Sequence, residues 1–223
     1  MSEDVNPNEF IITRKRKKYK FAKFANAENC FEFEQWMERK KGTIQTASQL
    51  CIELGAGTGL FSVELARRHP EKTFVAIDVK ADRLQTGAYA AAEDELSNIY
   101  FVRARADQIS ELFEAGRVGE LWLTFADPFP KKGSSGRRMT HGNFLRKYQT
   151  ILKPNGKFYI KHDNLDFFTW SLEQLVAERW VIDELSFDLH DSELDDEYKI
   201  LTTYEQRWLG EGRTVSFARA SHD

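Results

Sequence analysis

The residues best placed to do chemistry lie between positions 123 and 145, directly behind a short apolar run. Asp127 stands between that run and two prolines, Pro128 and Pro130, which stop both a strand and a helix from continuing. We therefore expect the Asp127 carboxylate to be exposed just past the C-terminal end of a strand. In open α/β sheets, ligands bind at this edge.

A cationic loop follows this acid. Its residues are Lys131, Lys132, Gly133, Ser134, Ser135, Gly136, Arg137 and Arg138. Ammonium and guanidinium groups on an adaptable backbone are suited to contacts with phosphates, so the loop is a candidate nucleic-acid contact. An ordinary solvated loop is the alternative interpretation.

A glycine-rich turn forms the second chemical group. Glu53 precedes it, and Gly55, Gly57 and Gly59 shape it. The GxGxG spacing differs from the GxGxxG of dinucleotide-binding turns, which favours a ligand without pyrophosphate. The Glu53 carboxylate would repel a phosphate and attract an ammonium or sulfonium group. Asp78, at the end of the next expected strand, is placed to accept hydrogen bonds from two ribose hydroxyls.

Alternating apolar runs and helical patterns position these residues. Strands are expected at residues 50–54, 74–78, 99–102, 121–125 and 157–161, helices at 60–69, 81–95, 144–152 and 167–179, and two further strands at 180–189 and 214–218. This order predicts an α/β fold: a doubly wound, mostly parallel seven-stranded sheet with helices on both faces, Rossmann-like in its winding.

Length and charge limit the possible functions. A chain of 223 residues is expected to hold a basic N-terminal extension, residues 1–45, and one main domain, residues 46–223. A net charge of −3 argues against indiscriminate coating of nucleic acid, so any such contact must use local patches. Seven of the ten residues at 14–23 are Lys or Arg, whereas residues 188–197 are strongly acidic and should repel phosphate.

Targeting and metal signals are weak in this chain. No apolar run approaches the roughly 20 residues needed to span a bilayer, and the first residues lack a signal-peptide pattern, so a cytoplasmic location is expected. Cys30 and Cys51 lack metal-ligand spacing and are expected to be reduced. The five histidines show no paired metal spacing, and we expect no metal; His162 is better interpreted as a packing or hydrogen-bonding residue than as a chemical one.

Taken together, these features resemble the class I methyltransferases that bind S-adenosylmethionine, over most of the chain from about residue 49. Within that class, three ordered motifs resemble the signatures of the bacterial tRNA guanine-N(7) methyltransferases. They are DPFPKK at residues 127–132 with Arg137 and Arg138, KHDN at residues 161–164, and TTYE at residues 202–205.

The resemblance implies methyl transfer from S-adenosylmethionine to N7 of a guanine in the variable loop of tRNA. We expect a monomer or homodimer without a membrane partner. It implies that Asp127 is catalytic and that Glu53, the glycine turn, Asp78 and Asp127 contact the cofactor. It implies substrate contacts from Lys131, Asp163, Thr202, Thr203, Tyr204 and Glu205. The loop at residues 132–138 would meet the RNA.

The chain departs from the family pattern at several places. Phe129 and His162 replace the usual tryptophan and threonine, and the loop is poorer in basic residues than usual. Arg105 falls where many relatives carry an acidic or amide residue near the adenine. We therefore expect a backbone contact to the cofactor at Arg105 and Ala106, with Asp107 as a weaker candidate.

Guanine N7 carries a lone pair and no proton, so its attack on a sulfonium methyl needs no general base. Alignment is the main requirement. Asp127 is expected to position the guanine and to stabilise the positive charge that develops on it, while Asp163 and Glu205 are candidate acceptors for its Watson–Crick edge.

Three other functions are compatible with parts of the sequence. An amino-group nucleic-acid methyltransferase would share the glycine turn, but such enzymes favour Pro-Pro-aromatic after the acid, and here Phe129 comes one place too early. The GxGxG spacing and Glu53 disfavour a dinucleotide-dependent oxidoreductase. A non-catalytic RNA-binding subunit would use the basic patches and keep the glycine turn without function.

Overall fold

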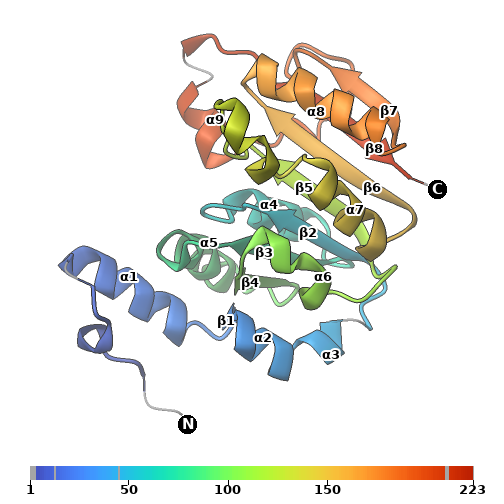
Figure 1. Cartoon of the computed structure of the whole chain (residues 1–223). Coiled ribbons are helices and arrows are strands. Elements are labelled where there is room, and N and C mark those ends of the chain that lie inside the picture. The colour runs from blue at the N-terminus through green and yellow to red at the C-terminus, as the bar shows by residue number, and fades with distance from the viewer. Residues whose placement is uncertain (1–3, 13, 45, 209–210, 223) are drawn as a thin grey trace.

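The computed structural model describes residues 4–12, 14–44, 46–208 and 211–222, which form one sheet with helices on both faces (Figure 1). The strands are β1 (Cys30–Glu32), β2 (Leu50–Leu54), β3 (Thr73–Asp78), β4 (Ile99–Arg103), β5 (Val118–Thr124), β6 (Leu152–His162), β7 (Val181–Ser186) and β8 (Ser216–Ser221). Their order across the sheet is β1-β4-β3-β2-β5-β6-β8-β7. Figure 1 shows this order from the N-terminal helices to the C-terminus.

Strand directions give the sheet its ligand-binding edge. β8 pairs antiparallel with β6 and β7, and the other neighbouring pairs are parallel. From β2 the chain adds β3 and β4 on one side, and then returns to add β5 on the other side of β2. The crevice at this reversal is where open α/β sheets bind ligands. The predicted doubly wound, mostly parallel architecture is therefore confirmed.

The strand count differs from the prediction by one. Seven strands were expected, and the sheet of the described residues has eight because β1 pairs parallel with the edge strand β4. β1 has only three residues, too few to show an alternating pattern, and it gains its order from the β4 partner. Sequence periodicity therefore could not identify it.

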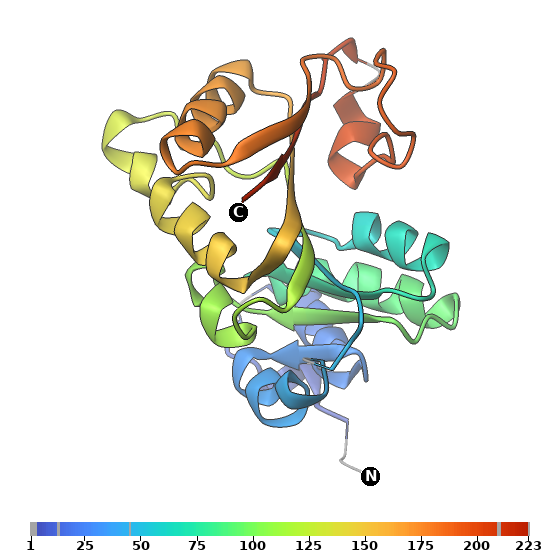
Figure 2. The same ribbon diagram turned by 90° about the vertical axis from the view of Figure 1, so that its right-hand side faces the viewer.

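Helices cover both faces of the sheet. They are α1 (Lys15–Asn26), α2 (Phe33–Arg39), α3 (Lys41–Ile44), α4 (Leu60–Arg68), α5 (Ala81–Glu93), α6 (Ile109–Leu112), α7 (Gly142–Ile151), α8 (Leu165–Ala177) and α9 (Thr203–Trp208), with 3-10 turns η1 (Pro7–Glu9), η2 (Ala106–Gln108) and η3 (Lys132–Arg137). One core joins α2, α6, α7 and α8 to the sheet, and the other joins α1, α4 and α5. Figure 2 shows α7 and α8 on one side of the sheet and α4 on the other.

The basic residues at 14–23 lie mostly in α1, which packs along α5. Phe24 is buried in the core under α5, and the Arg103 guanidinium at the end of β4 lies 5.3 Å from the centre of the Phe21 ring. The apolar side of α1 therefore faces the protein, whereas Arg16, Lys17 and others remain exposed. Among the described residues, no helix is long and apolar enough to cross a membrane.

The segment between β7 and α9, residues 187–202, is called the strap below. It covers β5, β6 and β8 on the α4 face with buried apolar side chains, while most of its acids are exposed. Tyr198 stacks on Phe217 of β8 with 4.5 Å between ring centres, and it also contacts Trp122 and Tyr159. Trp122 and Tyr159 are themselves stacked at 4.0 Å. The strap therefore packs on the sheet as a covering layer.

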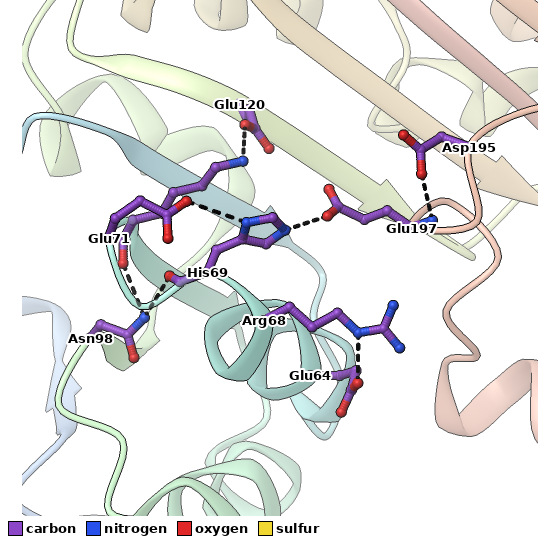
Figure 3. Close-up of polar contacts among 9 residues, drawn as sticks. Glu64, Arg68, His69, Glu71, Asn98, Glu120, Asp195 and Glu197 are labelled. Carbon is purple, nitrogen blue, oxygen red and sulfur yellow. Dashed lines mark hydrogen bonds and ion pairs between the residues drawn. The ribbon is translucent and has the colours of Figure 1, made fainter.

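Polar contacts fasten the strap to the end of α4 (Figure 3). The His69 imidazole lies between two carboxylates, with Nε2 bonded to Glu197 of the strap and Nδ1 3.3 Å from Glu71. Beside it, Lys72 Nζ donates to Glu120 of β5 at 2.8 Å. These contacts lie near the N-terminal ends of the strands and hold the strap at that end.

The glycine turn after β2 packs directly against α5. The Gly87 N–H of α5 donates to the Thr58 carbonyl at 2.9 Å. A Cβ added at Gly87 would lie 2.5 Å from that carbonyl oxygen and 2.7 Å from the Phe101 ring. The close contact between α5 and the turn therefore requires glycine at this position.

Gly87→Ala should lower the free energy of unfolding by about 1–3 kcal/mol, because the added methyl group overlaps backbone that cannot move away freely. Urea unfolding midpoints measure this loss. Gly42→Ala is the control, since a Cβ there meets nothing within 4 Å. Equal midpoints for the two variants would contradict the proposed close packing.

Candidate active site

The glycine turn lies at the C-terminal edge of the sheet, between β2 and α4. The φ values of Gly55, Gly57 and Gly59 are +75°, +57° and +72°, which residues other than glycine rarely adopt. The N–H groups of Gly55 and Ala56 both donate to the Ile77 carbonyl of β3, at 2.8 and 3.0 Å. The turn is thus closed onto the neighbouring strand.

Asp78 ends β3 and holds the same turn. One carboxylate oxygen accepts the Gly57 N–H at 2.9 Å, and the other accepts the Lys80 N–H at 2.8 Å. A carboxylate has about four lone-pair positions, so two backbone bonds leave acceptor capacity for the hydroxyls of a ribose. The backbone bonds fix the direction of the carboxylate before any ligand arrives.

Glu53 is buried beneath the turn, with only 2% of its surface exposed. Its carboxylate accepts hydrogen bonds from the Ser62 hydroxyl at 2.5 Å and the Thr124 hydroxyl at 2.8 Å. Burial raises the pKa of Glu53 to about 7, although both hydroxyls act in the opposite direction. A cationic ligand nearby would favour the charged form and reverse part of this shift.

The end of β4 leads into η2 at the predicted adenine contact. Arg105 is exposed, and its guanidinium forms two hydrogen bonds with the Asp107 carboxylate, one of them at 2.9 Å. The bond from Arg105 lowers the pKa of Asp107. The Arg105 N–H donates to Gln108 at 2.9 Å, and Ala106 follows in the first position of η2.

Asp127 is exposed in the loop after β5, as predicted. Two residues with left-handed backbone flank it: Phe125 with φ +50° and Phe129 with φ +40°. Such conformations are costly for aromatic residues and are found where a site needs a particular backbone course. The Phe125 N–H donates to the Lys161 carbonyl at 2.9 Å, which holds this turn against β6.

A pocket of about 230 Å³ opens between the ends of β5 and β6. Its lining residues are Phe125, Ala126, Asp127, Pro128, His162, Asp163, Asn164, Tyr204 and Arg213. Two predicted site acids, Asp127 and Asp163, therefore share one pocket. Arg213 Nη1 donates to Asp163 Oδ2 at 3.2 Å.

His162 forms part of the pocket wall and is fully hydrogen-bonded. Its Nε2 donates to the Ala126 carbonyl at 2.8 Å, and its Nδ1 accepts the Asn164 N–H at 2.9 Å. Burial lowers the pKa of His162, in agreement with the neutral tautomer that these two bonds require. The residue holds the two loops of the pocket together.

The TTYE motif occupies the start of α9, beside the glycine turn. The Thr203 and Thr58 hydroxyls are 2.9 Å apart and hydrogen-bonded, which joins α9 to the turn. The Tyr204 ring is partly exposed and lies 5.0 Å from the Phe125 ring. The motif thus connects the glycine turn with the pocket beside Asp127.

Glu205 points away from the pocket opening into the interior. It is 1% exposed, and its carboxylate binds Lys161 Nζ at 2.9 Å and the Thr202 N–H at 2.7 Å. His190 of the strap lies 3.2 Å from its other oxygen. Lys161 Nζ also donates to the Ile200 carbonyl at 2.8 Å. This cluster anchors both the strap and α9 to β6.

The cationic loop forms η3, with Lys131 at its start and Lys132, Gly133, Ser134, Ser135, Gly136 and Arg137 within it. Arg137 lies over the Phe129 ring at 4.4 Å, and Arg138 lies over the Trp170 ring at 4.4 Å. Arg138 also donates to the Phe129 carbonyl at 3.2 Å. The two arginines therefore stiffen the loop while Arg137 stays exposed.

Sequence reasoning assigned no role to Lys161 or Arg213. Lys161 follows the apolar run of a central strand, and a charge in such a strand signals a buried partner. Arg213 lies 50 positions after Asp163 and only the tertiary fold brings the two together. Ser62 and Thr124, the partners of Glu53, likewise carried no signal of their own.

The likeness to known proteins agrees with this geometry. Residues 47–218 match the family described as "Putative methyltransferase". The tRNA (guanine-N(7)-)-methyltransferase of Bacteroides thetaiotaomicron is 36% identical, over 76% of this chain and 67% of that protein. The enzyme of the same name from Bacteroides fragilis is 32% identical, over 92% of this chain and 85% of that protein.

Solved structures support the fold. The 16S rRNA methyltransferase KamB superposes with a TM-score of 0.62 at 17% identity, over 81% of this chain and 91% of KamB. The 16S rRNA (adenine(1408)-N(1))-methyltransferase of Catenulisporales acidiphilia has a TM-score of 0.60 at 18% identity, over 82% and 91% of the two chains. The fold is that of the class I methyltransferases, and by its sequence relatives the chain belongs to the tRNA (guanine-N(7)-)-methyltransferase family.

Proposed function

We propose that this protein transfers the methyl group of S-adenosylmethionine to N7 of a guanine in the variable loop of tRNA. The observation that carries the proposal is the pocket at the ends of β5 and β6, in which Asp127 and Asp163 face one space beside the glycine turn. Family membership supports the same reaction. A tRNA substrate also favours a cytoplasmic site of action.

The residues around the glycine turn fit S-adenosylmethionine by their chemistry. Asp78 has acceptor capacity for ribose hydroxyls, and the positive-φ turn gives a ligand close access to the backbone. Glu53 supplies a buried carboxylate whose hydrogen-bond partners Ser62 and Thr124 are neutral. A cationic ligand would compensate this charge. When bound, the cofactor supplies an electrophilic methyl group on its sulfonium.

The protein's task is then to hold the guanine. Tyr204 and Phe125 offer aromatic faces to the base, and Asp163 offers an acceptor for its Watson–Crick edge. Asp127 stands where positive charge develops on the purine and stabilises it. N7 carries no proton, so these residues need only position the base and match its charge. Glu205 acts through Lys161 and Thr202 by holding α9 in place.

Two cationic surfaces supply the contacts with tRNA. The first is the loop from Lys131 to Arg138, whose backbone at Gly133 and Gly136 is open to solvent. The second is α1, with exposed basic residues at Arg16, Lys17 and Lys23. The exposed acids of the strap lie over β5, β6 and β8, at the other end of the sheet from α1, and repel RNA there.

One assay tests the reaction. The protein is incubated with methyl-labelled S-adenosylmethionine and unmodified tRNA, and the product is cleaved chemically at N7-methylguanine. Cleavage at one variable-loop guanine, lost when that guanine is replaced by adenine, is the expected result. Label at an exocyclic amine would point to the amino-group reaction instead, and tRNA binding without label would point to a non-catalytic RNA-binding subunit.

Asp127→Asn should lower kcat by about 10²–10³-fold, because it removes the charge that faces the developing positive charge on the purine. Single-turnover rates with saturating tRNA and cofactor measure this effect. Asp191→Asn changes an exposed acid of the strap and should leave the rate unaltered. Normal turnover by Asp127→Asn would remove Asp127 from the chemistry.

Glu53 should make both stability and cofactor affinity depend on pH. Because the folded-state pKa lies above the ordinary value, Glu53 favours the folded state at acidic pH, and this contribution is lost as pH rises through about 7. Above pH 7, the free energy of unfolding of Glu53→Gln should therefore exceed that of the wild type by up to a few kcal/mol. The difference should be smaller near pH 5.

Binding of S-adenosylmethionine should show the opposite trend. The cationic cofactor favours ionised Glu53, so wild-type affinity should rise as pH increases through about 7, whereas Glu53→Gln should bind more weakly with a flatter pH profile. Calorimetric titrations on either side of pH 7 measure both proteins. Parallel profiles for the two would show that Glu53 does not interact with the cofactor's charge.

A further inference from the structure

Arg213 places a cation beside Asp163 in the pocket at the ends of β5 and β6. Asp163 is fixed in the wall, with 9% of its side chain exposed, whereas the Arg213 side chain stands at the rim with 47% exposed. Nη1 of Arg213 donates to Oδ2 of Asp163 at 3.2 Å, and Nε lies 3.7 Å from the Glu211 carboxylate. Two acids thus hold the guanidinium at the pocket opening.

The two groups are opposite in hydrogen-bonding character. A carboxylate only accepts hydrogen bonds, and a guanidinium only donates them. The Watson–Crick edge of guanine presents the acceptor O6 next to the donors N1–H and N2–H₂, whereas adenine presents a donor at C6 and an acceptor at N1. A pocket that sets a donor opposite position 6 and an acceptor opposite positions 1 and 2 therefore matches guanine, and with the base in the same orientation it opposes adenine.

We propose that Arg213 is a specificity-determining residue that donates to O6 of the target guanine, while Asp163 accepts from N1–H and N2–H₂. This assignment rests on the proposed function. The ion pair keeps the donor and the acceptor next to each other before the base arrives, so little reorganisation is needed on binding. Adenine would leave both charged groups facing the wrong partner, which is a strong basis for rejection.

The rest of the pocket is consistent with a base in this orientation. Phe125 and Tyr204 line it with aromatic rings 5.0 Å apart, so a purine can pack against them. N7 lies outside the Watson–Crick edge, so the contacts with Arg213 and Asp163 leave it free to react. Asp127 lines the same pocket and can face that side of the base.

An exposed arginine also fits a plain phosphate contact, and the two roles predict different behaviour. A phosphate contact weakens binding of every tRNA equally when it is removed. A contact with O6 matters only when the base carries a good acceptor at that position. Base analogues at the target position therefore separate the two roles.

The experiment compares kcat/KM for three ligated tRNAs that carry guanine, 6-thioguanine or inosine at the methylated position. Sulfur is a weak acceptor, whereas inosine keeps O6 and lacks only the N2 amino group. Arg213→Ala should lower kcat/KM by about tenfold or more on guanine and inosine, and by a distinctly smaller factor on 6-thioguanine. Arg213→Lys, which keeps a donor, should recover part of the loss.

Arg67→Ala is the matched control, because Arg67 is also 47% exposed and paired with acids, but lies on α4 away from the pocket. It should leave all three rates unchanged, and thermal unfolding checks that each variant is folded. An equal loss on all three bases would assign Arg213 to the RNA backbone, and an unchanged rate would give it no role. If the wild type forms no N7-methylguanine on the guanine tRNA, the proposed function itself fails.

Discussion

A buried ion pair holds the site together. Lys161 on β6 and Glu205 on α9 have no exposed side-chain surface, and the lysine also binds the Ile200 carbonyl of the strap. Burial lowers the pKa of Lys161, so the charged form depends on the nearby carboxylate. Removing one member of such a pair costs about 3–5 kcal/mol. Sheet, strap and α9 are thus joined at one point, next to the Thr203 contact with the glycine turn.

This anchoring brings two proposed binding sites together at one edge of the sheet. Glu53 and Asp78, which are proposed to contact the cofactor, lie on β2 and β3, whereas the pocket proposed to hold the base lies at the ends of β5 and β6. The chain reverses its winding direction between β2 and β5, which places the two sites next to each other. Because α9 contacts the glycine turn through Thr203 and the pocket through Tyr204, one helix connects the two sites.

Sequence patterns predicted the strands and turns that position this site, but not the tertiary contacts that hold it together. The strand at residues 50–54, the glycine turn after it and the exposure of Asp127 follow from local periodicity and turn chemistry, which act over a few residues. The strap was expected only as an acidic segment, because its packing depends on Tyr198 meeting aromatic rings from three distant strands. Arg213 was missed for the same reason, since its partner Asp163 is distant in sequence.

The sparse cationic loop gains order from stacking. Arg137 and Arg138 lie over the rings of Phe129 and Trp170, and the residue that replaces the family's tryptophan still provides an aromatic surface. Stacked arginines lose less conformational entropy when they contact a phosphate. Arg138, however, already donates to the Phe129 carbonyl, which leaves it fewer donors for a phosphate. The loop is therefore ordered but carries only a modest positive charge. On the proposed function, a tRNA held by the loop requires further cations elsewhere, and the exposed basic side of α1 is the surface proposed to supply them.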